Sequence, residues 1–286
     1  MIGEHEIPVG SNLYFGKSAK LKRELETKAC EILASNGFEE IVTPYFTFAN
    51  HSRNDIADSN KTIRLSDKDN NYLILRPDSS LDVIRLITKR LGRSTKHKKW
   101  FYIQPVFEYP SSEINQIGAE FMDCDNDVQM IKLASEILTE SKIDFTLQLS
   151  NSLLPKLAAS ESGLDFELFK NKAVSRLKEA KIEWLNTLVA IEDCSDLKKN
   201  LEIMPQKIKK ELQKLYDCAT ILGKNNVKID ALYVSSAGYY SGIFFRIFDK
   251  NEIFIKGGSY KANGKNSFGF AVYTDNIIKK LETENR

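Results

Sequence analysis

Two polar side chains in the segment from Phe101 to Glu120 have a spacing that lets them act on one ligand. Gln116 and Glu120 are four residues apart, and in a strand with alternating side chains this spacing puts both on the same face. An amide and a carboxylate on one face can bind a small charged molecule through charge-assisted hydrogen bonds. The other interpretation is a polar pair on the water-facing side of the strand.

The elements that would position this pair are the two strands of a hairpin. The run FYIQPVF, a short polar turn and the run NQIGAE are typical of paired strands. Glu108 follows the first run, where a carboxylate is also typical of a solvated strand end. The hairpin therefore carries a binding site if Gln116 and Glu120 face the interior, and only a polar edge if they face water.

Similar strand and helix patterns surround this hairpin. The helix predicted for 18–36 ends at Gly37, and a helix over 81–91 is predicted to start with Ser79 or Ser80 near its N-cap. Strands outnumber helices and their connections are hairpin-like, so we predict an α+β fold with an antiparallel sheet flanked by helices. The other predicted strands and helix in this half are FEEIVTPYFTF with Pro44 in its middle, TIRL, NYLIL, the helix DVQMIKLASEILTES and DFTLQLS.

The pattern changes to continuous helical periodicity between residues 153 and 222. We predict a helical insertion at 153–222 within a single core domain that spans 1–286. Its lysine-rich faces allow RNA contact, but solvated helix faces are the more common explanation. The later segments IDALYV, SGIFFRIF, EIFIKGGSY and SFGFAVY are predicted strands, with a tight turn at KGGSYKANGK and a final helix over Asn276–Leu281.

Composition limits the kind of protein this is. The chain has 286 residues, 42% of them hydrophobic and 28% charged, with a formal net charge of +2. This charge produces no general attraction to nucleic acid. The four cysteines are scattered and have no neighbouring histidine, so we expect neither a metal site nor a disulfide framework. Neither a signal sequence nor a long apolar run occurs, so we expect a cytoplasmic protein that does not contact the membrane.

Several segments occur in the order found in one enzyme family. YIQPVF with NQIGAE resembles motif 2 of the class II aminoacyl-tRNA synthetases in its histidyl form, and LRPDSS resembles the "LRPEGT" segment of that family. AGYYSGIFF resembles "RGLDYYTG", KGGSY resembles "GGRYD", and SFGFAVYTDN resembles motif 3. The helix and strand over 18–48 are similar to motif 1, which forms the dimer interface in that family. The resemblance implies a class II synthetase-like core with a helical insertion between motifs 2 and 3.

The charged residues that bind ATP in that family are replaced in this chain. Glu108 stands where motif 2 has its arginine, and Asn276 stands where motif 3 has its arginine. Ser235, Gly238 and Ser259 replace an arginine, an aspartate and a further arginine. At about 4 Å and an effective dielectric near 20, an unshielded Glu108 would repel a phosphate by about 4 kcal/mol. We therefore expect no adenylation, no catalytic residues and no cofactor. Because the sequence ends just after motif 3, we also expect no anticodon-binding domain.

The amino-acid pocket of that family is better retained than its ATP groups. The resemblance implies that one set of residues binds the α-ammonium of a histidine-like ligand and another binds its imidazole. Ser235 cannot hold the ligand carboxylate as the family's arginine does. The residues implied for the ammonium are Asp78, Ser80 and Gln116, and those implied for the ring are Glu120 and Tyr240, with Tyr239 beside them.

A histidyl-type core without its ATP groups resembles the family of ATP phosphoribosyltransferase regulatory subunits. The resemblance implies a non-catalytic chain that activates a catalytic subunit in the first step of L-histidine biosynthesis and helps mediate histidine feedback. Its expected partners are that catalytic subunit and a second copy of the chain, with L-histidine as a ligand and without tRNA. Two alternatives stay open, namely a stand-alone class II-like adenylating ligase and an interaction module that senses histidine or RNA.

Overall fold

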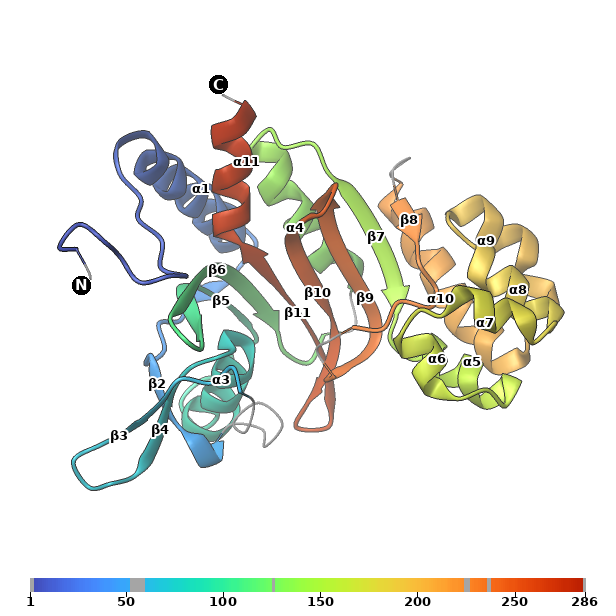
Figure 1. The fold of residues 1–286 in the computed structure, drawn as a ribbon, viewed down its shortest axis with the longest axis horizontal. Helices are drawn as coiled ribbons and strands as arrows, with labels where there is room; N and C mark the ends of the chain where they lie inside the picture. Colours follow the sequence, from blue (N-terminus) through green and yellow to red (C-terminus); the bar gives the residue numbers. More distant parts are fainter. Residues whose placement is uncertain (1–2, 52–59, 125–126, 224–226, 236–237, 285–286) are drawn as a thin grey trace. The chain divides into compact units, whose positions relative to one another are not determined.

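A computed structural model places the chain in two compact units. One unit is formed by Met1–Phe121 with Ala271–Arg286, and the other by Met122–Phe270. Both units have helices against antiparallel-rich sheets, so the predicted α+β class is confirmed (Figure 1). No helix in the described part of the chain is long and apolar enough to cross a membrane. The residues described are 3–51, 60–124, 127–223, 227–235 and 238–284.

The first unit is built around the predicted hairpin. Strand β5 (Lys99–Glu108) pairs antiparallel with β6 (Ser112–Phe121) over their whole lengths, and the short β1 (Glu39–Glu40) runs parallel to β5. Helix α1 (Gly16–Ser35) and helix α11 (Thr274–Glu284) contact each other, and both contact β6. Helix α1 ends as predicted before Gly37, whose φ of +78° suits glycine.

The segment predicted as one strand over FEEIVTPYFTF is broken in two, so this prediction was wrong in extent. Its first part is β1, and its second part is β2 (Phe46–Phe48) in a separate small sheet. The chain has no regular structure at residues 41–44, and Pro44 lies there without a backbone N–H to offer a strand partner. Strand β4 (Tyr72–Leu75) is the middle of that small sheet, with β2 and β3 (Arg64–Ser66) antiparallel on either side.

The helix predicted for 81–91 begins earlier than expected and changes its geometry. Helix α3 covers Ser79–Arg85 and continues as a π-helical turn over Leu86–Leu91. Its N-cap is Asp78, whose Oδ1 accepts a hydrogen bond of 2.9 Å from the backbone N–H of Leu81. Ser79 and Ser80 follow it in the first turn, near the N-cap as predicted, and the Asp78 carboxylate caps the free amide of that turn.

The second unit contains a sheet in which β10, β9, β7 and β8 follow one another in that order. Strand β9 is antiparallel to both β7 and β10, and β8 is parallel to β7. Helix α4 (Asp127–Glu140), close to its predicted bounds, contacts β9 and β10. The strands are β7 (Thr146–Asn151), β8 (Val227–Ile229), β9 (Tyr240–Asp249), β10 (Glu252–Ala262) and β11 (Lys265–Tyr273), the last beside β10.

One strand prediction in this unit was wrong. In IDALYV the strand ends at Ile229. The N–H of Asp230 still bonds to the carbonyl of Leu149 on β7, but the N–H of Tyr233 then bonds to the carbonyl of Asp230 and closes a turn. KGGSY lies inside β10, in agreement with the strand predicted over EIFIKGGSY, and the tight turn predicted within KGGSYKANGK falls at residues 263–264. A Cβ on Gly257 would lie 2.5 Å from the Phe245 ring and 2.6 Å from a backbone oxygen of β11, so close packing of the strands explains the glycine.

The helices predicted from the periodicity between residues 153 and 222 are confirmed. Leucines predominate among their buried side chains, which also include Phe169, Met204 and Ile208. Helix α10 is tied to the sheet by a hydrogen bond of 2.8 Å from Asn151 Nδ2 to the carboxylate of Glu211. The helices are α5 (Leu154–Ser162), α6 (Phe166–Lys170), α7 (Val174–Glu179), α8 (Glu183–Ala190), α9 (Cys194–Asn200), the 3-10 turn Leu201–Ile203 and α10 (Gln206–Leu222).

Candidate ligand-binding site

The hairpin register places Gln116 and Glu120 on one face, as predicted. Gln116 pairs with Gln104 and Glu120 pairs with Trp100, so these side chains share a face. Glu120 has 0% exposure, whereas Gln116 is half-buried. The interpretation of a water-facing pair therefore fails for Glu120, whose carboxylate lies inside the unit.

Tyr102 is the centre of the cluster that contains three of the predicted residues. It lies on the same face of the hairpin and is fully buried. Its hydroxyl is 3.1 Å from the hydroxyl of Ser80. Ser80 therefore contacts the phenol directly, and the charges of Glu120 and Asp78 both act on it.

Burial and charge together keep the Tyr102 phenol protonated. Burial raises the pKa of Tyr102 well above its usual value, and the negative charges of Glu120 and Asp78 raise it further. Burial also raises the pKa of Asp78, an effect that the hydrogen bond from Leu81 opposes. Tyr102 consequently stays a hydrogen-bond donor at neutral pH. A ligand cation at this cluster would meet carboxylates whose negative charge is poorly solvated, which strengthens its attraction.

The space that Tyr102 occupies depends on Gly118, directly opposite it in the register. A Cβ on Gly118 would lie 2.1 Å from Cζ of Tyr102 and 2.2 Å from its hydroxyl oxygen. No side chain can occupy that position without displacing the phenol. Neither Tyr102 nor Gly118 was among the site residues predicted from the sequence. A glycine inside a strand, opposite an aromatic residue when the hairpin is counted from its turn, is the signal that points to them.

A buried arginine holds the segment that leads into Asp78. Arg76 is fully buried, and its Nε donates 2.8 Å to the carbonyl of Pro105 on β5. Its Nη1 donates 3.0 Å to the carbonyl of Thr43. Gln104 completes the link, because its Nε2 donates 2.9 Å to the Thr43 hydroxyl. These bonds fix Asp78 relative to the hairpin without using any group of the cluster itself.

Glu108 occupies the end of β5, where it pairs with Ser112. Its carboxylate is 3.5 Å from the ammonium of Lys61, and both side chains are substantially exposed. The repulsion of about 4 kcal/mol expected for an unshielded carboxylate is therefore reduced by a neighbouring cation and by water. Glu108 still offers no positive charge to a phosphate, and it also fits the alternative of a solvated strand end.

Tyr239 and Tyr240 belong to the second unit, where they form part of an aromatic cluster. Their ring centroids are 4.7 Å apart, and the ring of Tyr240 is 4.9 Å from that of Phe244. Tyr239 also meets Tyr260 edge-on at 6.3 Å. Both predicted tyrosines are half-buried, so each retains surface that a ligand can reach. The segment that contains them begins at Ala237, which lies outside the described residues.

Ser259, Gly238 and Asn276 also depart from the synthetase motifs. The Ser259 hydroxyl donates 3.3 Å to the carboxylate of Asp127. Gly238 is exposed, with open space where a Cβ would be. Asn276 lies in the first turn of α11, whose start is held by Asp275, which accepts 2.8 Å from the N–H of Asn115. Within the described ranges, no group of three or more His, Cys, Asp or Glu side chains is placed to hold a metal ion.

Comparisons of sequence and of structure both find histidyl-tRNA synthetase-like proteins. A family model described as histidyl-tRNA synthetase matches residues 15–277. The ATP phosphoribosyltransferase regulatory subunit of Wolinella succinogenes is 44% identical over 285 residues, which cover 100% of this chain and 99% of that protein. The protein of the same name from Helicobacter hepaticus is 39% identical over 281 residues, covering 98% and 99%. A solved ATP phosphoribosyltransferase regulatory subunit/histidyl-tRNA synthetase from Bacillus halodurans has the same fold, with a TM-score of 0.83 at 19% identity over 98% of this chain and 84% of that one.

Proposed function

The chain belongs to the family of ATP phosphoribosyltransferase regulatory subunits, which share the histidyl-tRNA synthetase fold, and from this premise we propose how it acts. It is the regulatory subunit of a two-component ATP phosphoribosyltransferase in L-histidine biosynthesis. The observation that carries this proposal is the 44% identity to a regulatory subunit along essentially the full length of both chains. Fold alone would not distinguish this role from that of a synthetase.

The partner in this role is the catalytic subunit of the transferase, and the regulatory chain contributes no chemistry of its own. The replacement of two cationic positions, at Glu108 and Asn276, supports the absence of adenylation, since a preorganised donor at the phosphate typically supplies about 100-fold to 1,000-fold in rate. Titration with ATP and magnesium is expected to give no binding heat, and the isolated chain should show no histidine-dependent pyrophosphate exchange. Robust exchange would favour the alternative of an adenylating ligase.

L-Histidine is the proposed feedback ligand, bound by Asp78, Ser80, Gln116, Glu120, Tyr239 and Tyr240. The buried carboxylate of Glu120 and the half-buried rings of the tyrosine pair support this assignment. Feedback requires that histidine bind the active and inactive complexes with different affinities, because equal binding shifts no equilibrium. Histidine must therefore alter how this chain engages the catalytic subunit.

A homodimer through the motif 1 region is the proposed state of the chain. In β2 the apolar side chains are exposed and the polar one is buried, the reverse of the usual arrangement. Phe46 and Phe48 are 56% and 42% exposed, and Thr47 between them is buried. Leu65 of β3 lies on the same face as Phe48, because both pair with Leu73 of β4, and it is 37% exposed. A group of exposed apolar side chains on one face of a small sheet is typical of an interaction surface. Sedimentation should give a dimer, and Phe46→Glu should shift it toward monomer, whereas Lys68→Glu in the turn of the same sheet should not.

The decisive experiment combines this chain with a short catalytic subunit from the same genome. Activity should rise on mixing, and L-histidine should inhibit the mixture more strongly than the catalytic subunit alone. The matched variants are Glu120→Gln in the cluster and Glu113→Gln, an exposed acid on the same strand. We expect Glu120→Gln to weaken histidine inhibition about ten-fold or more while activation persists, and Glu113→Gln to change neither. An unchanged transferase on mixing would contradict the proposal.

A further inference from the structure

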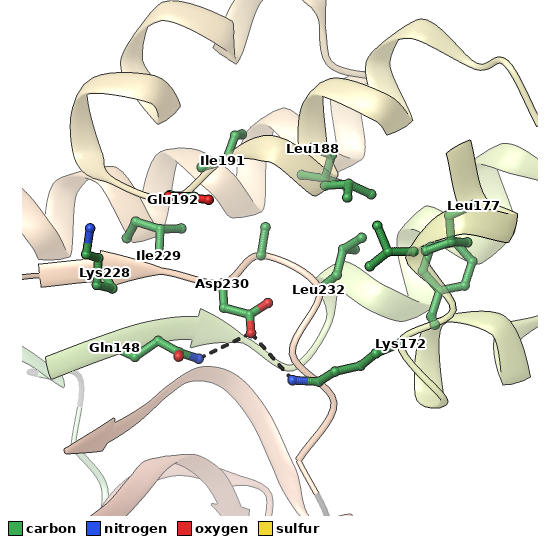
Figure 2. Close-up of a pocket in the computed structure, with 14 residues that line it drawn as sticks. Gln148, Lys172, Leu177, Leu188, Ile191, Glu192, Lys228, Ile229, Asp230 and Leu232 are labelled. Atoms are coloured by element: carbon green, nitrogen blue, oxygen red, sulfur yellow. Dashed lines mark hydrogen bonds and ion pairs between the residues drawn. The ribbon is translucent and has the colours of Figure 1, made fainter. Parts of the chain in front are cut away.

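The second unit contains a pocket that the proposed histidine site does not use. It has a volume of about 350 Å³ and lies between the short helices α6, α7 and α8 and the end of β8 (Figure 2). That volume is near the lower end of the range of roughly 300–1,000 Å³ found for small-molecule sites. Its lining includes Gln148, Lys172, Leu177, Leu188, Asp230 and Leu232.

Asp230 is a carboxylate held in a fixed position on one side of this pocket. Its backbone N–H bonds at 3.0 Å to the carbonyl of Leu149 on β7. Its Oδ2 accepts 3.4 Å from Nε2 of Gln148, and Gln148 is itself oriented by a bond of 2.7 Å from Arg246 Nη2 to its Oε1. The carboxylate is therefore preorganised, so that a ligand ammonium can meet it at little entropic cost.

Lys172 is a movable cation at the same side of the pocket. Its Nζ is 3.7 Å from Asp230 Oδ2 and 4.5 Å from the centre of the Tyr233 ring, and its side chain is 51% exposed. An exposed pair at that separation is weak. Figure 2 shows Gln148 and Lys172 converging on Asp230. A ligand with one positive and one negative end can therefore separate Lys172 from Asp230 and engage both.

The rest of the lining limits the ligand further. The four charged lining residues are two lysines, Lys172 and Lys228, and two acids, Glu192 and Asp230, so their formal charges sum to zero and the lining favours a ligand without net charge. The remaining walls are aliphatic or aromatic apart from Gln148. We propose that this pocket binds a free amino acid with an apolar side chain, with its ammonium on Asp230, its carboxylate on Lys172 and its side chain against Leu177, Leu188 and Leu232. This inference does not depend on the regulatory role proposed above.

A ligand series tests the two charges separately. Calorimetry on the full chain is carried out with L-leucine, with isoamylamine, which lacks the carboxylate, and with 4-methylpentanoate, which lacks the ammonium. L-Phenylalanine and L-methionine test whether a larger apolar side chain is accepted. We expect saturable binding of at least one of the three amino acids, and binding at least ten-fold weaker for both truncated analogues of leucine. Absence of binding for all three amino acids, or equal binding of either analogue, would overturn the proposal.

Variants of the pocket test its location. Asp230→Asn and Lys172→Met should each weaken binding of the amino acid about ten-fold or more. Val174→Trp, which fills the pocket from a partly exposed position, should abolish it while retaining both charges. The controls Glu179→Gln and Lys178→Met alter exposed charges of α7 outside the lining and should bind normally. Normal binding by both Asp230→Asn and Val174→Trp would place the ligand elsewhere and refute the assignment.

A partner side chain is the competing occupant, and the same variants separate it from a free amino acid. If no amino acid binds and Val174→Trp weakens association with the catalytic subunit, the pocket is a protein contact and the proposal is overturned. If leucine binds and the Val174→Trp chain still associates normally, the assignment to a small ligand stands. Because L-histidine binding is measured with the same variants, loss of leucine binding with histidine inhibition intact would show that the two sites are separate.

Discussion

Replacing Gly118 with alanine adds only one methyl group, but it should destabilise the fold around Tyr102 strongly. The added Cβ would lie 2.1 Å from Tyr102 Cζ, far inside van der Waals contact. Both residues are in paired strands, so neither backbone can withdraw without breaking the hairpin register. The ring of Tyr102 is fully buried and must therefore move within a packed interior.

The expected loss of stability combines two contributions. Forcing an extra methyl group into a packed core typically costs about 1–3 kcal/mol. Displacing the phenol also removes its contact of 3.1 Å with the Ser80 hydroxyl, which is worth about 1 kcal/mol. A decrease of about 2–4 kcal/mol in the free energy of unfolding is therefore expected. With a denaturant slope near 3 kcal/mol/M, the urea midpoint should fall by about 1 M.

The assay is urea unfolding followed by circular dichroism, with a matched control and a rescue. The control is Gly238→Ala, since an added Cβ there meets no atom within 4 Å and the midpoint should hardly move. In a Tyr102→Leu background the phenol ring is absent, so Gly118→Ala should cost less than about 1 kcal/mol. An equal loss in both backgrounds, or a loss below about 0.5 kcal/mol in the original chain, would refute the argument from close approach.

Three further predictions concern single groups. Burial raises the pKa of Asp78 above its usual value of 3.8, so the charged carboxylate lowers the free energy of unfolding as the pH rises through that raised pKa. Asp78→Asn, which can still cap α3, should therefore increase the free energy of unfolding at pH 7. Urea unfolding measured against pH should show this gain disappearing below about pH 4. Burial raises the pKa of the Cys218 thiol to about 12, so iodoacetamide at pH 8 should label Cys218 only after unfolding, as mass spectrometry will show. Glu108→Gln should change the free energy of unfolding by less than about 1 kcal/mol, because its pair with Lys61 is exposed, and a larger loss in urea would contradict that description.

The hairpin and the helical segment could be predicted because their signals are local. Alternation along β5 and β6 depends only on which residues face the interior, and their short turn sets the register. The helical spacing between residues 153 and 222 is equally local. The same reasoning failed at IDALYV, where the strand ends at Ile229. Gly257 of KGGSY is explained by Phe245 and the backbone of β11, whose closeness no local pattern reveals.

The candidate site shows the same division. Gln116 and Glu120 could be placed on one face by counting, whereas the burial of Glu120 and its association with Tyr102 could not. Asp78 was expected to face a ligand, and it also caps α3, a role that depends on where the helix begins. Glu108 was treated as an unshielded carboxylate because Lys61 is 47 residues away in sequence and is brought to it only by folding.

The sequence by itself determined the family, the order of the motifs and the residue types at each position of the ATP and amino-acid sites. These are properties of residue identity and spacing, and they are retained in any conformation. Only the tertiary structure decided which phenol fills the space over Gly118, which cation lies beside Glu108, and which charges converge on the pocket at Asp230. Those relations join residues far apart in the chain, and their energies depend on distance and burial, which exist only once the chain has folded.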